Sequence, residues 1–443
     1  MATIVGTAND DLLSGTSNDD QIFGRGGNDN ISGGLGNDLI DGGNGNDTLA
    51  GNAGDDTFRG SRGDDSIDGG DGIDTADYSS LGKKITLSGV GTIEKAGGFG
   101  KDQLFKVETV IADASVANNT IDASQSLPGV PAVVDLEAET ISALNVPGLG
   151  TLTFNVINFV NIKGTNESDS IIGNNQRNQL FGNDGDDSID GRGGNDLIDG
   201  GGGNDKLAGG AGDDTFKGSQ GNDNIDGGDG IDTANYSKLG KSITLSGVGA
   251  VEKAGKFGTD QLFKVETVIA DASIANNTID ASQSLPGVFI TVDLQNQSLA
   301  ANNVPGLGTL PFTVINFDNV IGTNESDIIT GDNQNNQLVG NDGNDIISGG
   351  LGKDSITGGQ GDDILTGGFG ADKFIFNSLK DGLDTIKDYD FAQKDVIQVS
   401  KVGFGTTNIS DFSFDTSSGN LSFLGNQFAF LENLPSNLSI QLV

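Results

Sequence analysis

The sequence predicts an all-β solenoid built from three arrays of short repeats, with β-rich segments between the arrays and a β cap at the C-terminal end. Three observations predict this fold. A nine-residue pattern, G-G-x-G-x-D-x-U-x with U a large apolar residue, recurs 22 times in the 443 residues. A longer period of 158 residues separates the array starts at Gly6, Gly164 and Gly322. The apolar positions stay in register within each array, which a disordered acidic chain does not require.

The nonapeptide has a direct physical interpretation, which the unit from Gly24 to Ser32 illustrates. Its first six residues predict a turn and its last three a short strand. Glycines at positions 1, 2 and 4 allow positive φ angles that side chains resist. In x-U-x the middle side chain points inward and its neighbours point outward, because strand side chains alternate. Two units then complete one coil of 18 residues, and aspartates one coil apart stack in rows along two edges.

Stacked carboxylates and turn carbonyls form rows of oxygen atoms that suit a hard cation, and Ca²⁺ is the natural choice. Without a cation, the like charges along each row repel. For a single unit, Asp-Gly-Asn simply marks a surface turn; for so many units in register, calcium is the better explanation. The predicted metal ligands are the position-6 aspartates: Asp11, Asp20, Asp29, Asp38, Asp47, Asp56, Asp65, Asp74, Asp169, Asp187, Asp196, Asp205, Asp214, Asp223, Asp232, Asp327, Asp345, Asp354, Asp363 and Asp372.

Calcium binding and folding are predicted to be one event. Each unit buries a single large apolar side chain, yet nine Gly-rich residues have to be ordered, so the core alone is a weak driving force. If each array of n units forms n−2 sites, about 16 ions bind. Their charge would bring the net charge of −39 to about −7, an ordinary value for a soluble protein.

The units resemble the nonapeptide repeats of RTX (haemolysin-type) calcium-binding proteins. The resemblance covers roughly half of the chain and implies a parallel β-roll, Ca²⁺ held between successive turns, and export through a type I system. Three kinds of departure weaken particular units. Asparagine replaces the position-6 aspartate, alanine replaces the large apolar residue, or the third glycine is missing from the opening units. The residues concerned are Asn178 and Asn336, Ala76 and Ala234, and Asn9, Asn18, Glu167, Gln176, Glu325 and Gln334.

Charge and calcium supply predict the location and the partners. With 63 acidic against 24 basic residues, the chain is not expected to bind nucleic acid or an anionic membrane surface. We expect no cleaved signal peptide, because Met1–Gly6 has neither a basic nor an apolar region, and no transmembrane helix. Low-affinity calcium modules act outside cells, where the ion is millimolar. The expected location is extracellular, with cell-surface association as an option, and the expected partners are calcium, type I export machinery and cell-surface or matrix components.

The chain divides by pattern into six segments. Between arrays lie two related 86-residue segments, and 28 of 30 residues match between 100–129 and 258–287. Their β-rich runs predict either wider coils stacked on the arrays or small separate β-domains. Tyr78 and Tyr236, directly after the arrays, are expected to plug the ends where the roll stops. The predicted segments are 1–77 (array 1), 78–163 (intervening segment 1), 164–235 (array 2), 236–321 (intervening segment 2), 322–375 (array 3) and 376–443 (cap).

The intervening segments offer weak candidates for catalysis. Asp102, Glu108 and Lys106 could do acid–base or nucleophilic work, as could Asp260, Glu266 and Lys264 in the second copy. A solvated strand face with ordinary charges is the favoured interpretation, because nothing has the spacing of a triad, a nucleophile elbow or a zinc site. The chain also lacks histidine and cysteine. We therefore expect no enzyme.

The C-terminal segment is expected to close the third array, because an open solenoid end exposes its core and its strand edges. The run from Asp381 to Phe391 resembles the closing segment of secreted RTX proteases and lipases. The apolar tail Leu438–Val443 resembles an uncleaved type I secretion signal. A plain β cap is the alternative for this tail, and both can hold.

A structural or surface-associated role, in a matrix, surface layer, adhesion or motility coat, fits these features best, because repeats fill most of the chain. The alternatives are a haemolysin-like toxin and an RTX-family secreted hydrolase. Lytic members of the family carry apolar helical segments ahead of the repeats, and hydrolases carry a catalytic domain there. Here the repeats begin at Gly6.

Overall fold

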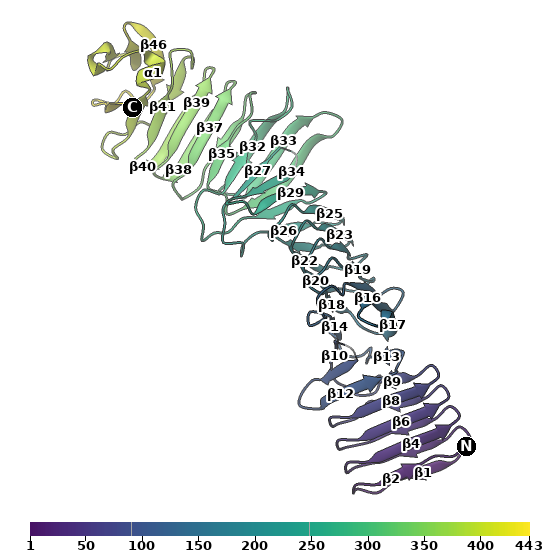
Figure 1. Ribbon diagram of the computed structural model, residues 1–443. Helices are drawn as coiled ribbons and strands as arrows, with labels where there is room; N and C mark the ends of the chain where they lie inside the picture. The colour runs from purple at the N-terminus through teal and green to yellow at the C-terminus, as the bar shows by residue number, and fades with distance from the viewer. Residues whose placement is uncertain (90, 248) are drawn as a thin grey trace. The chain divides into compact units, whose positions relative to one another are not determined.

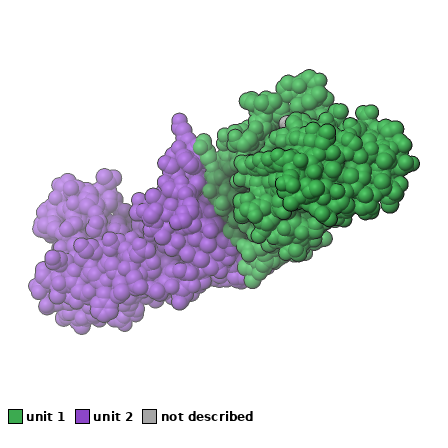
Figure 2. Space-filling model, turned by 90° about the horizontal axis from the view of Figure 1, so that it is seen from below, with its two compact units in different colours: residues 1–232 green, residues 233–443 purple. Residues whose placement is uncertain are grey.

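The computed structural model describes residues 1–89, 91–247 and 249–443. They form two compact units, Met1–Asp232 and Thr233–Val443 (Figures 1 and 2). Strands dominate both units, as the sequence predicts. Among the described residues, no helix is both long enough and apolar enough to cross a membrane.

Array 1 is a two-sided stack of parallel strands in which each residue pairs with the residue 18 positions further on. Ile22 lies beside Ile40 on one sheet, and Leu13 lies beside Ile31 on the other. This register confirms that two nonapeptides make one coil. One sheet contains β1 (Thr3–Val5), β3 (Gln21–Phe23), β5 (Leu39–Asp41), β7 (Thr57–Arg59) and β9 (Thr75–Asp77), and the other contains β2 (Leu12–Ser14), β4 (Asn30–Leu35), β6 (Thr48–Ala53) and β8 (Ser66–Asp71).

The core of the array consists of two files of apolar side chains, one from each sheet, all from position 8 of the units. Ile22, Ile31, Ile40 and Phe58 are fully buried, because the strand between two turns directs its middle residue inward. Ala76, where the sequence departs from the pattern, is buried as well. The smaller side chain therefore weakens the core locally without turning the strand.

The first intervening segment continues the stack. On one sheet, β12, β11 and β10 form an antiparallel meander between β8 and β14; on the other, β17, β16 and β15 lie between β13 and β19. Of the two possibilities, this pairing supports wider coils. The strands are β10 (Ile85–Ser88), β11 (Thr92–Lys95), β12 (Gly100–Phe105), β13 (Thr109–Ile111), β14 (Thr120–Asp122), β15 (Ala132–Asp135), β16 (Thr140–Val146), β17 (Gly150–Ile157) and β18 (Asn161–Lys163).

Tyr78 is buried, as expected, but the expectation that it plugs the end of the roll is wrong. Strands β12 and β13 pair in parallel with β8 and β9, so the sheets continue past it. Array 2 follows in the same unit with the same 18-residue register. Its strands are β19 (Ser170–Ile172), β20 (Gln179–Asp184), β21 (Ser188–Asp190), β22 (Leu197–Gly202), β23 (Lys206–Ala211), β24 (Thr215–Lys217) and β25 (Asn224–Asp229).

The second unit repeats this plan. Two meanders, β27–β29 and β32–β34, precede array 3. Strand β26 (Thr233–Asn235) belongs to the last repeat of array 2. The segment strands are β27 (Ile243–Ser246), β28 (Ala250–Lys253), β29 (Gly258–Phe263), β30 (Thr267–Ile269), β31 (Thr278–Asp280), β32 (Phe289–Asp293), β33 (Ser298–Val304), β34 (Gly308–Ile315) and β35 (Asn319–Ile321). The array strands are β36 (Ile328–Thr330), β37 (Gln337–Asp342), β38 (Ile346–Gly352), β39 (Ser355–Gln360), β40 (Ile364–Gly370) and β41 (Lys373–Phe376).

Residues 376–443 close array 3, as a solenoid end requires. Strands β42 and β43 add in parallel to β40 and β41, and the tail strand β47 adds to β43. Phe404, at the end of helix α1 (Lys401–Phe404), contacts the rings of Phe412, Phe423 and Phe428. The tail is thus part of a β cap, and its role as a secretion signal stays a prediction. The cap strands are β42 (Asp384–Ile386), β43 (Val396–Val399), β44 (Phe412–Phe414), β45 (Asn420–Phe423), β46 (Asn426–Leu431) and β47 (Ile440–Leu442).

Replacing Ile40 by alanine should destabilise the folded protein by about 2–5 kcal/mol, because the side chain is fully buried between two neighbours of the same file. Leu12, which is 79% exposed, gives the matched control, and Leu12→Ala should change stability by about 0.5 kcal/mol or less. Denaturant unfolding of the calcium-loaded protein measures both. Equal effects of the two substitutions would contradict a core built from the position-8 side chains.

Candidate metal centre

A ladder of hydrogen bonds joins the position-6 aspartates of successive coils. The backbone N–H of Asp29 donates to Oδ1 of Asp47, and the N–H of Asp47 donates to Oδ1 of Asp65, at 2.8 and 3.0 Å. The same bond recurs along all three arrays. Because one carboxylate oxygen is held by the neighbouring coil, the whole group is fixed inside the turn.

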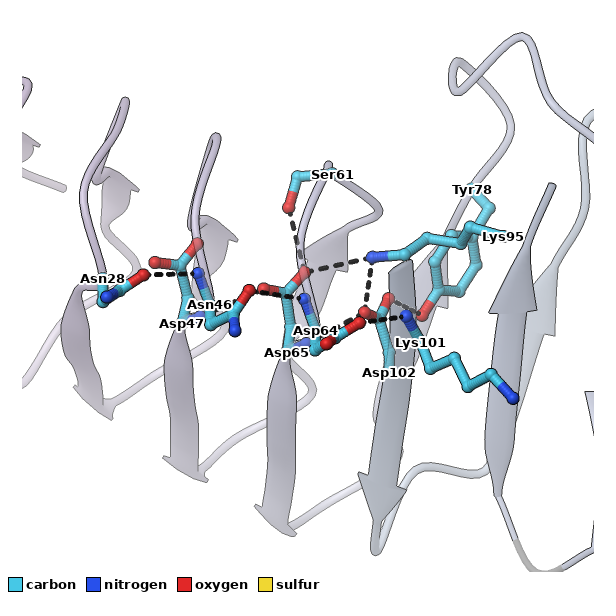
Figure 3. A network of polar contacts seen from close by, with 10 residues as sticks. All are labelled: Asn28, Asn46, Asp47, Ser61, Asp64, Asp65, Tyr78, Lys95, Lys101 and Asp102. Carbon is cyan, nitrogen blue, oxygen red and sulfur yellow. Dashed lines mark hydrogen bonds and ion pairs between the residues drawn. The ribbon is translucent and has the colours of Figure 1, made fainter. Parts of the chain in front are cut away.

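A second ladder runs in the opposite direction at position 5. The N–H of Asn46 donates to Oδ1 of Asn28, and the N–H of Asp64 donates to Oδ1 of Asn46 (Figure 3). These side chains lie at the surface, whereas the position-6 carboxylates are buried. The two ladders leave the second oxygen of each position-6 aspartate as the group that faces the interior of the turn.

That second oxygen accepts no hydrogen bond in most units. Among the described residues, fourteen buried Oδ2 atoms lack a partner. A buried ionised carboxylate without a compensating group is strongly unfavourable, so such an oxygen needs a cation or a proton as its partner. The residues are Asp29, Asp38, Asp47, Asp56, Asp74, Asp187, Asp196, Asp205, Asp214, Asp232, Asp345, Asp354, Asp363 and Asp372.

The glycine at position 1 leaves room for a ligand beside this oxygen. A Cβ placed on Gly24 would lie 2.2 Å from Oδ2 of Asp29 and 2.4 Å from the carbonyl oxygen of Gly42, one coil further on. A Cβ on Gly51 would meet Oδ2 of Asp56 and the carbonyl of Gly69 in the same way. Each cradle thus combines one carboxylate with backbone carbonyls, a donor set made only of oxygen that fits Ca²⁺.

Side-chain clusters of the kind that hold transition metals are not found: the described part of the chain gathers no three Asp, Glu, His or Cys side chains around one point. The rows differ from such clusters because each possible ion site has a single carboxylate, and backbone carbonyl oxygens provide its other ligands. Which of the predicted aspartates bind an ion therefore has to be judged from the turns themselves.

The residue at position 2 separates two kinds of turn. In all fourteen units with an unpartnered oxygen it has positive φ, from 72° at Arg192 to 117° at Gly359. Gly, Asn and Arg occupy these positions. Glycine adopts this conformation freely and asparagine with little strain. We call these fourteen units open turns.

We call the remaining eight units closed turns. Their position-2 residues do not have a positive φ. In six of them the N–H of position 2 donates to the position-6 side chain, as Thr16 does to Asp20 at 2.7 Å. The Thr16 hydroxyl adds a second bond to the same oxygen. In the other two, a serine hydroxyl reaches the aspartate. The eight position-2 residues are Thr7, Thr16, Ser61, Thr165, Asn174, Ser219, Thr323 and Asp332.

Six of the twenty predicted ligands lie in closed turns, where the turn already supplies hydrogen-bond donors to the carboxylate. They are Asp11, Asp20, Asp65, Asp169, Asp223 and Asp327. Asn178 and Asn336 also lie in closed turns. The amide oxygen of Asn178 accepts from the N–H of Asn174, and its amide group donates to the carbonyl of Val160. Both ends of this side chain are therefore satisfied without a metal.

Six of these closed turns are the two opening units of each array. The same units also lack the third glycine of the sequence pattern. In four of them position 2 is a β-branched threonine, which resists the left-handed conformation and whose hydroxyl can bond the aspartate four residues later. The other two have Asn174 and Asp332 there, and asparagine also occurs at position 2 of open turns, as Asn52.

The acidic residues that follow the last aspartate of each carboxylate row were not predicted as part of the rows. Oδ1 of Asp102 accepts from the N–H of Asp65, and Glu108 accepts from the N–H of Asp74. In the cap, Asp384 and Asp395 do the same for Asp363 and Asp372. Each is followed by the strand ending x-U-x of the nonapeptide, as in Asp102-Gln103-Leu104-Phe105. That short pattern, without the glycines, could have identified them.

The catalytic candidates of the first copy have structural partners. Asp102 and Glu108 extend the rows, and the carbonyl of Lys106 would lie 2.0 Å from a Cβ on Gly69, in the place of a position-1 glycine carbonyl. Lys106 and Glu108 also line a mainly apolar cavity of about 720 Å³ in the first unit, together with Leu87, Leu104 and Phe154. Its lining contains no nucleophile paired with a base.

Burial shifts the acidity of the rows. Desolvation, with repulsion from Asp169 and Asp205, raises the pKa of Asp187 to about 8. Desolvation similarly raises the pKa of Asp196 and of Asp345 to about 7. These shifts show how strongly the metal-free turns disfavour negative charge.

Replacing three open-turn aspartates by asparagine, Asp38, Asp47 and Asp56, should remove about three bound calcium ions, because each loses its unpartnered anionic oxygen. The matched control replaces Asp11, Asp169 and Asp327, whose turns are closed, and should lose none. Equilibrium dialysis followed by elemental analysis counts the ions. Equal losses in the two triple variants would contradict the distinction between open and closed turns.

The metal-free protein should be more folded in acid than in base. Raised carboxyl pKa values mean that the metal-free fold binds more protons than the unfolded chain between pH 3.8, the ordinary Asp value, and about 8. Its stability therefore falls as pH rises through that window. Far-UV circular dichroism in calcium-depleted buffer should show more β-structure near the acid end than at the basic end. Excess calcium should remove this dependence; a metal-free fold that instead gains stability toward pH 8 would contradict the assignment.

Comparisons with known proteins agree with this geometry. The family described as RTX calcium-binding nonapeptide repeat (4 copies) matches residues 5–40, 41–76, 163–198, 199–234, 321–356 and 339–374. The search of curated proteins gave no match. Among solved structures, the extracellular lipase LipA from Serratia marcescens aligns with a TM-score of 0.21 and 21% sequence identity, over 60% of this chain and 37% of the lipase chain. The three arrays, residues 5–76, 163–234 and 321–374, are RTX calcium-binding nonapeptide repeats folded as parallel β-rolls.

Proposed function

We propose that this protein is a secreted calcium-binding protein whose β-rolls fold when calcium reaches them outside the cell, and that it serves a structural or surface-associated role. The observation that carries the proposal is the set of fourteen buried Oδ2 atoms without a partner. Each lies next to a cradle that only a glycine leaves open, as at Gly24 and Gly51.

The chain's own residues prepare these positions. The Oδ1 ladder fixes each carboxylate. In the open turns the left-handed residue at position 2 does not donate its N–H to Oδ2, whereas in closed turns such as that of Thr16 the position-2 N–H does donate to this oxygen. Calcium, when bound, supplies the positive charge that lets the ionised rows stack. Fourteen divalent ions, one for each open turn, would bring the net charge from −39 to about −11.

Export through type I machinery fits this dependence on calcium. Inside a cell, where calcium is scarce, the rows would stay charged and the arrays unfolded, a state suited to passage through an exporter. Outside, millimolar calcium would drive folding. Folding on emergence would then oppose backward movement of the chain.

A structural role, in a matrix, surface layer, adhesion or motility coat, is proposed over catalysis. The acids that could have served in an active site, Asp102 and Glu108, instead accept backbone hydrogen bonds from Asp65 and Asp74. A haemolysin-like toxin or a secreted hydrolase remains the alternative. Leakage of dye from liposomes would support the toxin, and turnover of ester or peptide substrates by the calcium-loaded protein would support the hydrolase.

The direct test is a calcium titration of the metal-depleted protein followed by far-UV circular dichroism at neutral pH, with magnesium as control. We expect a cooperative transition from coil to β-structure with calcium. Magnesium should be ineffective, because it demands a smaller, regular octahedral site. Full β-structure in chelator, unchanged by calcium, would contradict calcium-driven folding.

A further inference from the structure

The carboxylate row on one edge of array 1 ends at a buried lysine. Nζ of Lys95 lies 3.2 Å from Oδ2 of Asp65 and also contacts Oδ1 of Asp102 (Figure 3). The Tyr78 hydroxyl donates to the other oxygen of Asp102 at 2.7 Å. All four residues are at most 3% exposed. We call this group the lysine clasp.

The clasp occupies the position that a metal cradle has in the interior coils. A Cβ on Gly60 would lie 2.1 Å from the Tyr78 ring. The corresponding Cβ on Gly24 would instead meet the carbonyl of Gly42. Tyr78 is one coil after Gly60, so its ring fills the space beside the glycine, and the ammonium of Lys95 takes up the oxygen that is unpartnered elsewhere.

Charge makes the ammonium necessary at this point. Asp65 and Asp102 are two carboxylates of neighbouring coils, both buried, and a buried charge is tolerated only with a partner and hydrogen bonds. Lys95 supplies the partner, while Ser61, Tyr78 and the N–H of Asp65 supply hydrogen bonds. A divalent cation would have to displace an ammonium that is tethered to the chain and enclosed on every side.

We propose that Lys95 replaces calcium at the last position of this row, so that the coil containing Asp65 and Asp102 closes without metal. The inference rests on the proposed binding of calcium by the rows, and it names where that binding stops. The end of the array would then be ordered before calcium arrives, giving the neighbouring open turns a preformed coil on which to stack.

The second copy contains the same arrangement. Nζ of Lys253 contacts Oδ1 of Asp260, and the Tyr236 hydroxyl donates to Oδ2 of Asp260 at 2.8 Å. All three side chains are buried. They lie 158 positions after Lys95, Asp102 and Tyr78. A second unit that builds the same buried contacts makes a chance ion pair a poor explanation.

Hydrogen exchange of the full chain in chelator, read by mass spectrometry, tests the proposal. Peptides covering β11 and β12 should exchange at least about tenfold more slowly than peptides covering β4 and β6, because only the former have a built-in cation. Exchange that is equally fast in both regions would overturn the proposal, whether or not any variant folds.

Substitution gives a second readout. Lys95→Met keeps the length of the side chain but removes its charge, so protection of β11 and β12 in chelator should be lost. Calcium should restore it through the neighbouring open turns, but the variant should bind no more ions than wild type, because the Tyr78 ring still fills the cradle beside Gly60. Lys101→Met is the matched control, because Lys101 lies on the same hairpin in an exposed pair with Glu94, and it should change neither protection nor ion number.

The outcomes separate the two claims. If wild type binds no calcium, the proposed function fails and the inference fails with it. If wild type binds calcium but Lys95→Met keeps its protection in chelator, only the inference is overturned. If Lys95→Met does not fold even with calcium, slow exchange of β11 and β12 in wild-type protein in chelator still supports the clasp, and fast exchange still overturns it.

Discussion

The hydrogen bond from each turn aspartate's N–H to Oδ1 of the aspartate one coil later is the interaction on which the structure depends. It accompanies the 18-residue register, and the position-6 carboxylates that it holds are buried, from Asp20 onward in array 1. Because Oδ1 is then committed, the fate of Oδ2 decides the chemistry of the unit. In Asp47 that oxygen has no partner, whereas in Asp65 it accepts from Lys95. Strands about 4.8 Å apart place such charges close together, so each row needs positive charge between its members.

The backbone at position 2 decides which turns need metal. A left-handed residue, such as Gly43 or Asn52, directs its N–H away from the carboxylate and leaves Oδ2 open. A threonine in an extended or right-handed conformation directs its N–H and its hydroxyl to the carboxylate, as in Thr16. In the two opening units of every array the position-2 N–H donates to the position-6 side chain, from threonine in four units and from Asn174 and Asp332 in the other two. Each array thus begins with turns that are complete without an ion and continues with turns that are not.

Much of this could be predicted from the sequence, because the nonapeptide repeats its chemistry many times. The period of nine gave the two-unit coil, the inward apolar files and the carboxylate rows. The estimate of about 16 sites came from counting units, and it exceeds the fourteen open turns by the units that begin at Gly60 and Gly218. Both contain serine at position 2, and the aspartate of the first accepts from the lysine clasp.

What could not be predicted depends on contacts between distant residues. Lys95 is 30 positions from Asp65 and reaches it only because the first meander folds back onto β8. Nothing in the local sequence distinguishes this lysine from a solvated one such as Lys101. Likewise, the choice between wider coils and separate domains required strand pairing, because Ile85–Ser88 and Ala132–Asp135 are compatible with both. The six-part division of the chain stays a prediction based on pattern.

Anomalous diffraction from crystals of the calcium-loaded protein, recorded at a wavelength where calcium scatters anomalously, tests the central claim most directly. The account predicts peaks beside the unpartnered Oδ2 atoms of the open turns, such as those of Asp29, Asp38 and Asp47. It predicts none at the closed turns of Asp11, Asp20 and Asp65. Peaks of equal height at open and closed turns, or no peaks along the rows, would contradict it.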